Sequence, residues 1–201
     1  MSKKPLGLRE RNRIRTRDEI LAAMSVLLGE NPFESITIDD VAQRAGVSRG
    51  TIYTYFPDGR DQLVRDAYTR IADALTADAI ARREQHEGFT DRVVALATAF
   101  SDIVSTPEGR FYGIMGPGTL GPVSSVAGTG SRTFAIMLTE DLERAKAAGL
   151  LAPDAPAAEI AVLLAGALRE IGATVARDPE RAAQLLRALR IAADAMLAPR
   201  S

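Results

Sequence analysis

The sequence lacks cysteine and tryptophan entirely, and it has a single histidine, His86, among its 201 residues. Without cysteine, the chain can form neither disulfide bonds nor thiolate metal sites. One histidine and no cysteine also argue against a zinc centre and against catalysis by a Ser–His or Cys–His pair. These absences predict a protein that holds no metal and no cofactor.

Long apolar runs are missing as well. None of them approaches the roughly 18 residues that a membrane span needs. The stretch Ile20–Gly29 could be taken for a signal-peptide core, but Asp18 and Glu19 stand directly before it, no small-residue cleavage site follows it, and its apolar residues have helical spacing. We therefore expect a soluble, cytoplasmic protein that does not contact the membrane.

The net charge of the chain is small, but its charged residues are unevenly distributed. The net charge is −1, yet residues 1–60 hold 10 Lys and Arg against 8 Asp and Glu, whereas residues 61–201 hold 15 against 18. The first 17 residues carry seven basic side chains against one acidic residue, Glu10. Such a basic arm is either a phosphate-binding element, because each neutralised phosphate releases counterions, or a solvated, disordered tail.

Apolar residues recur with helical spacing along the whole chain, and no segment of any length alternates with a period of two. The sequence therefore predicts an all-α fold of about nine helices. A Gly- and Pro-rich stretch, Gly113–Ser131, interrupts the pattern and is not expected to be regular throughout. The main helices are expected from the basic arm to Gly29, after Pro57, from about Asp91, and over 132–149, 155–176 and 179–198.

The most informative stretch is TIDDVAQRAGVSRGTIYTYF, residues 37–56. Thr37 followed by Asp40 has the spacing of a capping box at a helix start. Gly46 is the left-handed residue expected where that helix ends, and Ser48 caps a second helix. Two short helices joined by a tight turn that contains glycine make a helix-turn-helix motif.

The second of these helices presents a polar face. Arg49 can donate two hydrogen bonds to the O6 and N7 atoms of guanine, and Thr51 can contact a phosphate or a thymine methyl group. Gly50 lets the backbone approach a groove wall, because it has no side chain. The alternative is an ordinary helical hairpin with a polar outer surface. The expected inner and outer residues are Val41, Ala42, Ala45, Val47 and Ile52 in the seam, and Ser48, Arg49, Gly50, Thr51, Tyr53 and Tyr55 outside.

The longer segment ITIDDVAQRAGVSRGTIYTYFPDGRDQLV resembles the DNA-binding signature of the tetracycline-repressor (TetR) family, and the specific match covers roughly residues 17–66. The resemblance implies a three-helix DNA-binding domain over residues 1–60 and a helical effector-binding and dimerisation domain over residues 61–201. PDGRDQL is one residue longer than the common pattern, so Arg60 rather than Gly59 is aligned with the basic phosphate contact. The DNA-binding residues predicted in this way are Thr37, Arg44, Ser48, Arg49, Gly50, Thr51, Tyr53, Tyr55 and Arg60.

The resemblance assigns dimerisation to the last two helices, which would pack with their counterparts as a four-helix bundle. Two recognition helices on a two-fold axis would read a pseudo-palindrome with half-sites about 34–36 Å apart, or a multiple of that distance. The apolar stripes of these helices agree with an interface, or else they face the protomer's own core. The predicted interface residues are Ile160, Leu164, Leu168, Ile171, Leu185, Leu189, Ala193 and Met196.

The resemblance also implies that a small molecule enters the C-terminal domain and moves the fourth helix. Apolar and aromatic residues in the middle of the chain predict a pocket for a hydrophobic or aromatic effector, although such stripes also occur in plain cores. Arg110 and Thr119 could orient the ligand, and the Gly- and Pro-rich stretch could be a portal or hinge. The pocket candidates are Phe100, Ile103, Val104, Phe111, Tyr112, Met115, Phe134, Met137, Leu138, Glu170 and Thr174.

Two other classes of function are an enzyme and a protein-interaction module. An enzyme would need converging acid–base groups, but Asp141 and Glu143 do not share a helix face, and Glu159 and Glu170 would lie roughly 16 Å apart along a helix axis. A helical protein–protein interaction module without DNA binding stays as the alternative. The sequence thus predicts a ligand-responsive transcriptional regulator, with a repressor favoured over an activator by resemblance alone.

Overall fold

The computed structural model describes residues 7–115 and 129–197 of the chain. Within these residues every regular element is helical, which confirms the predicted all-α class. In chain order the elements are α1 (Leu8–Glu30), η1 (Phe33–Ser35), α2 (Ile38–Ala45), α3 (Arg49–Tyr55), α4 (Arg60–Arg83), α5 (Phe89–Val104), α6 (Arg110–Ile114), α7 (Thr129–Ala147), α8 (Ala157–Arg177), η3 (Pro179–Arg181) and α9 (Ala182–Ala195).

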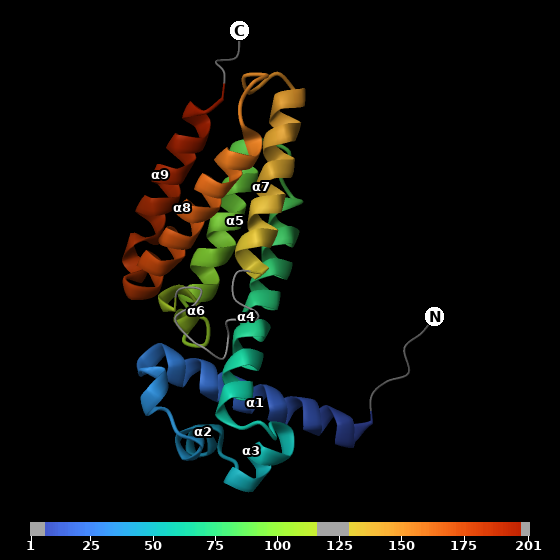
Figure 1. Cartoon of the computed structure of the whole chain (residues 1–201), viewed down its shortest axis with the longest axis vertical. Coiled ribbons are helices and arrows are strands. Elements are labelled where there is room, and N and C mark those ends of the chain that lie inside the picture. The colour runs from blue at the N-terminus through green and yellow to red at the C-terminus, as the bar shows by residue number, and fades with distance from the viewer. Residues whose placement is uncertain (1–6, 116–128, 198–201) are drawn as a thin grey trace.

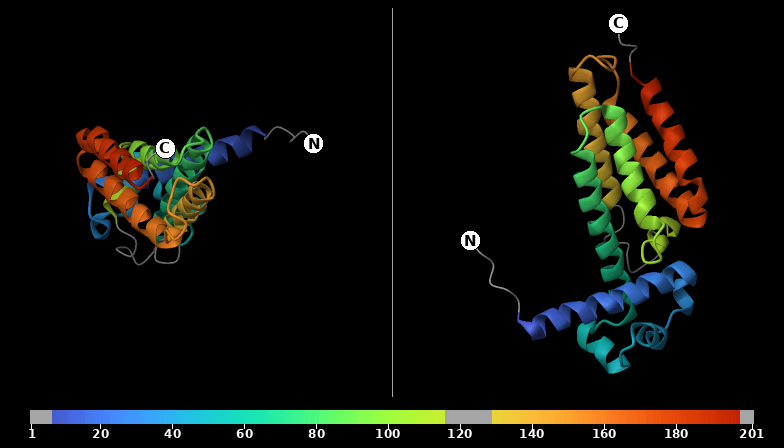
Figure 2. Two further views of the ribbon diagram at one scale, coloured as in Figure 1. Left: turned by 90° about the horizontal axis from the view of Figure 1, so that it is seen from above. Right: turned by 180° about the vertical axis from the view of Figure 1, so that it is seen from behind.

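The helices are arranged in two parts joined by α4. In Figure 1, α4, α5, α7, α8 and α9 run along the long axis of the molecule, α1 crosses beneath them, and α2 and α3 form the far end. The views from above and from behind agree (Figure 2). α4 packs on α5, and α5 packs on α8 and α9. One end of α4 therefore lies in the helix-turn-helix part and the other in the helical bundle.

The buried apolar side chains form two clusters that meet along α4. The N-terminal cluster joins α1, α2, α3 and α4 as far as Ile71, and it also takes Phe111 from α6. The C-terminal cluster begins at Leu75 of α4 and joins α5, α7, α8 and α9. The expected boundary between residues 60 and 61 coincides with the start of α4. It stays a prediction, because the first part of this helix packs with the N-terminal cluster.

A buried ionic cluster fixes the far end of α4. Arg83 donates to Asp141 of α7 through Nε at 2.7 Å and through a terminal nitrogen at 2.9 Å, and Arg92 of α5 donates to the same carboxylate at 2.5 Å. The three side chains are almost fully buried. Since a buried charge must be paired, this cluster holds the ends of α4, α5 and α7 in one arrangement.

The predicted helices are present, and two short elements add to them. η1 and α6 were not predicted, because three and five residues are too few to show a helical period. The Gly- and Pro-rich stretch falls mainly in 116–128, outside the described residues, and Thr119 lies there too. α7 begins at Thr129, inside the stretch expected to be irregular.

The apolar stripes predicted for dimerisation pack largely within the protomer's own core, and their part in a dimer stays a prediction. Helical periodicity shows that a face is buried but not which partner buries it. Both helices keep other apolar side chains outside, namely Val162 and Leu163 of α8 and Ile191 of α9, which are 65%, 73% and 61% exposed. Of the predicted residues, Leu164, Leu168, Ile171, Leu189 and Ala193 are buried in the C-terminal cluster, while Ile160, Leu185 and Met196 are partly buried against it.

Candidate nucleic-acid interface and internal pocket

The start of α2 has the predicted capping box. The Thr37 hydroxyl accepts the Asp40 N–H at 3.2 Å, and the Asp40 carboxylate accepts the Thr37 N–H at 2.8 Å. Hydrogen bonds from the Thr37 hydroxyl and then from its backbone lower the pKa of Asp40, because they favour the ionised carboxylate. At the other end of the helix Gly46 has a φ of 66°, which confirms the left-handed turn. Thr37 thus lies at the exposed N-terminus of α2.

α3 is oriented by its cap and its buried residue. The Ser48 hydroxyl accepts the Thr51 N–H at 3.1 Å, while Ile52 is fully buried against the N-terminal cluster. With this side inward, Ser48, Arg49, Gly50 and Tyr53 are exposed. Thr51 and Tyr55 are half-buried, and the Thr51 hydroxyl is engaged with that of Ser48 at 2.8 Å. The predicted recognition residues therefore gather on and beside the outer face of α3.

Arg49 is the cation at the centre of this face. Its guanidinium lies 3.2 Å from Asp39 and 5.9 Å from the centre of the Tyr53 ring. A hydrogen bond with Tyr53 first, and the charge of Asp39 second, raise the pKa of Arg49, so the side chain stays charged. An exposed ion pair contributes little stability, so this guanidinium can exchange Asp39 for another acceptor at small cost.

The two other predicted arginines are used within the domain. Arg44 pairs with Glu30 of α1 at 2.7 Å. Arg60 donates to the carbonyl of Ile36 at 3.1 Å and stacks 4.3 Å from the centre of the Phe33 ring. Both guanidinium groups would have to leave these partners to bind a phosphate, and their role in DNA binding stays a prediction.

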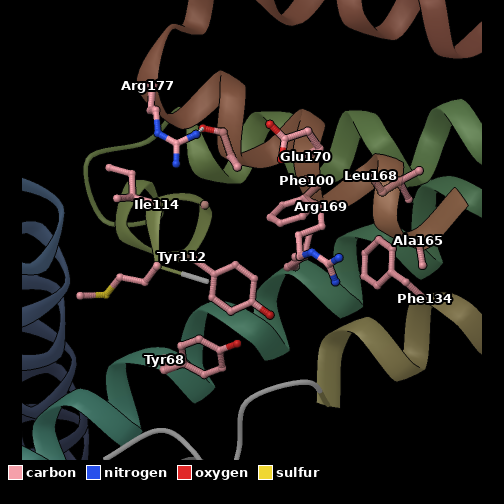
Figure 3. A pocket seen from close by; sticks show the side chains of 14 residues that line it. Tyr68, Phe100, Tyr112, Ile114, Phe134, Ala165, Leu168, Arg169, Glu170 and Arg177 are labelled. Carbon is pink, nitrogen blue, oxygen red and sulfur yellow. Dashed lines mark hydrogen bonds between the residues drawn. The ribbon is translucent and has the colours of Figure 1, made fainter. Parts of the chain in front are cut away.

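A cavity of about 310 Å³ lies between the helices of the C-terminal part. Its volume is at the low end of the range for small-molecule sites, roughly 300–1,000 Å³. Figure 3 shows its lining side chains converging from α4, α5, α6, α7 and α8. The lining residues are Tyr68, Leu75, Phe100, Tyr112, Gly113, Ile114, Met115, Phe134, Ala165, Leu168, Arg169, Glu170, Ala173 and Arg177.

Part of the predicted pocket lines this cavity. Phe100, Tyr112, Met115, Phe134 and Glu170 do so. The remaining candidates do not, because helical periodicity marks buried faces and does not separate a packed core from a cavity wall. Arg110 instead donates to the carbonyl of Ala176 at 3.0 Å. The candidates outside the lining are Ile103, Val104, Phe111, Met137, Leu138 and Thr174.

The sequence analysis did not identify most of the polar side chains around the cavity. Tyr68 and Tyr112 lie with ring centres 4.7 Å apart, and burial, then the neighbouring Tyr68, raises the pKa of Tyr112 far above its ordinary value. In Figure 3 the two hydroxyl groups turn toward the space that Arg169 also faces. In the sequence, Tyr68 is recognisable only as part of a buried helix face. Nothing in the sequence indicates that Arg169 lines a cavity. The cavity thus combines aromatic walls with tyrosine hydroxyls and a guanidinium.

Neither a membrane span nor a metal cluster is found among residues 7–115 and 129–197. No helix there is both long and apolar enough to cross a bilayer. No group of three or more His, Asp or Glu side chains in this part of the chain could hold a metal ion.

Known protein sequences resemble the N-terminal part of the chain. The family of bacterial regulatory proteins, tetR family, matches residues 20–67. The HTH-type transcriptional regulator AlkX of Mycobacterium tuberculosis (strain ATCC 25618 / H37Rv) is 38% identical over 79 residues, which is 39% of this chain and 37% of AlkX. The chain therefore spans little more than a third of the length of this relative.

Solved structures resemble more than nine-tenths of the chain. The fatty acid degradation regulator FadR from Bacillus halodurans superposes with a TM-score of 0.75, over 94% of this chain and 95% of FadR, at 14% identity. SmeT, solved as a complex with triclosan, superposes with a TM-score of 0.70, over 93% and 96%, at 18% identity. At this level of identity the likeness shows a shared fold.

Proposed function

We propose that this chain, which residues 20–67 identify as a member of the tetR family of bacterial regulatory proteins, is a transcriptional regulator that binds duplex DNA through α3. The observation that carries the proposal is the outer face of α3. Its Ser48 cap and its buried Ile52 orient the helix, so that the exposed Arg49 presents polar donors on a face that can enter a major groove. Such a regulator would act in the cytoplasm.

The DNA contacts divide into two kinds. Arg49, Gly50 and Tyr53 would face base edges and the groove wall, where Arg49 offers a bidentate contact to guanine. Thr37 and Ser48, at the starts of α2 and α3, would contact phosphates and fix the orientation of the domain. Arg44, Thr51 and Arg60 would add contacts after releasing or sharing the intramolecular partners described above, and the half-buried Tyr55 would add a further one.

A homodimer would present two such faces. Val162 and Leu163 on α8 and Ile191 on α9 are exposed apolar side chains, and these two helices contact one another. Exposed apolar side chains grouped on neighbouring helices favour a protein partner, and a second copy of this chain supplies the same surface. Two-fold symmetry would then require a pseudo-palindromic operator.

The cavity would hold the effector. Aromatic rings favour a hydrophobic or aromatic body, while Arg169 and the tyrosine hydroxyls favour a weakly acidic or hydrogen-bonding group at one end. That SmeT was solved with triclosan supports a small-molecule role for the corresponding part of this fold. We propose a repressor, which the effector releases from DNA to the extent that it binds the non-binding conformation more tightly.

The proposal is tested by selecting bound fragments from a genomic DNA library and footprinting the winners. We expect a pseudo-palindromic sequence whose binding is lost in Arg49→Ala but retained in Arg144→Ala, an exposed arginine on α7. A repeat with metabolite extract tests whether a ligand is needed for binding. If folded protein enriched no DNA under either condition, the regulator proposal would be wrong and a helical interaction module would be favoured.

A further inference from the structure

The N-terminal half of α1 carries two sets of arginines on opposite faces. Arg9, Arg13 and Arg17 are spaced by four residues and share one face, whereas Arg11 and Arg15 lie about halfway around the helix. On the premise that the chain binds DNA as proposed above, we propose that Arg9 and Arg13 form a second DNA contact, to phosphates flanking the half-site that α3 reads.

Arg17 fixes the direction of the first face. Its guanidinium pairs with Asp66 of α4 at 2.7 Å and lies 5.1 Å from the centre of the ring of Phe56, the residue that follows α3. The face therefore turns toward the α3–α4 junction. Arg13 and Arg9 continue the same face by one and two further turns, beyond the packed part of the domain, and both are exposed. Arg13 and Arg9 therefore lie progressively farther from Arg17 toward the N-terminus of α1, on the side of the helix that faces α3.

Arg11 and Arg15 turn to the other side. They line a shallow groove with Arg70, which lies one turn beyond Asp66 along α4 in the direction of the helical bundle. Arg15 is also within 3.6 Å of Glu19 on its own helix. This second pair has the same charge as Arg9 and Arg13, but it faces away from α3.

The position of α1 brings the first face near the end of the molecule that would meet DNA. Figure 1 and the rear view in Figure 2 both show α1 sloping toward the level of α3 as it nears its N-terminus, with its first turns projecting past α2 and α3. Arg9 and Arg13, four residues apart, are separated by about 6 Å along the helix axis. This separation is comparable to about two phosphate steps of one strand, at about 3.4 Å each along the DNA axis.

Folding does not account for the first pair. Within the described part of the chain, Arg9 and Arg13 have no hydrogen bond and no ion pair, since the cations of α1 that do pair are Arg15 and Arg17. Like charges four residues apart on a helix repel and slightly destabilise it. Two unpaired guanidinium groups held on one projecting face therefore suit an anionic partner with regularly spaced charges, and duplex DNA is that partner.

The experiment compares two double variants with equal charge and opposite faces. Arg9→Ala/Arg13→Ala and the control Arg11→Ala/Arg15→Ala are titrated by fluorescence anisotropy with the selected operator, over a series of salt concentrations. We expect the first variant to bind at least tenfold more weakly in about 0.1 M salt, with a salt slope reduced by up to about 2 per protomer. The control should stay within about threefold of wild type.

A trimmed duplex that lacks the flanking base pairs gives a second readout. On it, wild type should bind no better than Arg9→Ala/Arg13→Ala, and DNase footprints of that variant should shorten at their outer edges only. Equal losses in both double variants, or no loss in either, would overturn the inference. In both of those cases Arg49→Ala would still abolish binding, whereas failure of wild type to bind any DNA would overturn the proposed function itself.

Discussion

At the scale of single residues, Asp141 shows how much a local pattern can conceal. Its spacing from Glu143 on the same helix excluded an acid–base pair, but nothing in the sequence indicates that Arg83 and Arg92 reach it from two other helices. These contacts join residues 49 and 58 positions apart. Two buried arginines share one buried carboxylate, so the charge of Asp141 is needed to balance them.

Replacing Asp141 tests that balance. In Asp141→Asn the buried Arg92 loses its counter-charge and Arg83 keeps only that of the exposed Glu140, so we expect the free energy of unfolding to fall by about 3–5 kcal/mol in urea denaturation. The matched control is Glu140→Gln, because Glu140 also pairs with Arg83, at 2.9 Å, but is exposed. Its loss should cost less than about 1 kcal/mol. Equal effects of the two variants would contradict the assignment of the buried cluster.

At the scale of elements, most of the helix-turn-helix part could be predicted because its signals are local. The capping box at Thr37, the left-handed Gly46 and the Ser48 cap each depend on residues within four positions, and each is present. The pocket and the apolar stripes of α8 and α9 depend on which helices meet in space. The sequence therefore indicated buried faces but could not distinguish a cavity wall, such as Phe100, from solid core, such as Leu138.

α4 is the element that would connect the two proposed sites. Tyr68 and Leu75 line the cavity, while Leu63 and Val64 are buried against α1, α2 and α3. Arg83 holds the far end of the helix in the ionic cluster. A ligand that displaces the middle of α4 would therefore move the end that carries α3 more than the end that is anchored.

Filling the cavity tests this connection. Ala165 lines the cavity from α8. In Ala165→Phe the new ring would occupy part of the 310 Å³ cavity and leave less room for an effector. We expect the variant to bind the operator within about threefold of wild type but to lose release by any effector that dissociates wild type. The measurement is operator binding by anisotropy with and without an active fraction of metabolite extract. Release that is equal in variant and wild type would place the effector elsewhere.

At the scale of the whole molecule, the proposed dimer depends on the surface of α8 and α9, which would hold the two reading faces together. Leu163, at 73%, is the most exposed of its large apolar side chains, and Val162 and Ile191 accompany it. A charge placed in the middle of an apolar interface must be buried without a partner, and this disfavours association strongly. Leu163→Glu should therefore convert a dimer into monomers.

Sedimentation velocity and operator titration would check this expectation together. We expect Leu163→Glu to sediment as a monomer and to bind a full operator no better than wild type binds a single half-site, because the second α3 is no longer linked to the first. Ile136→Glu is the matched control, since Ile136 is 60% exposed on α7, outside the proposed interface. That variant should stay dimeric with wild-type affinity. If Leu163→Glu stayed dimeric as well, the interface would lie on another face, and the spacing of the two α3 helices would have to be set there.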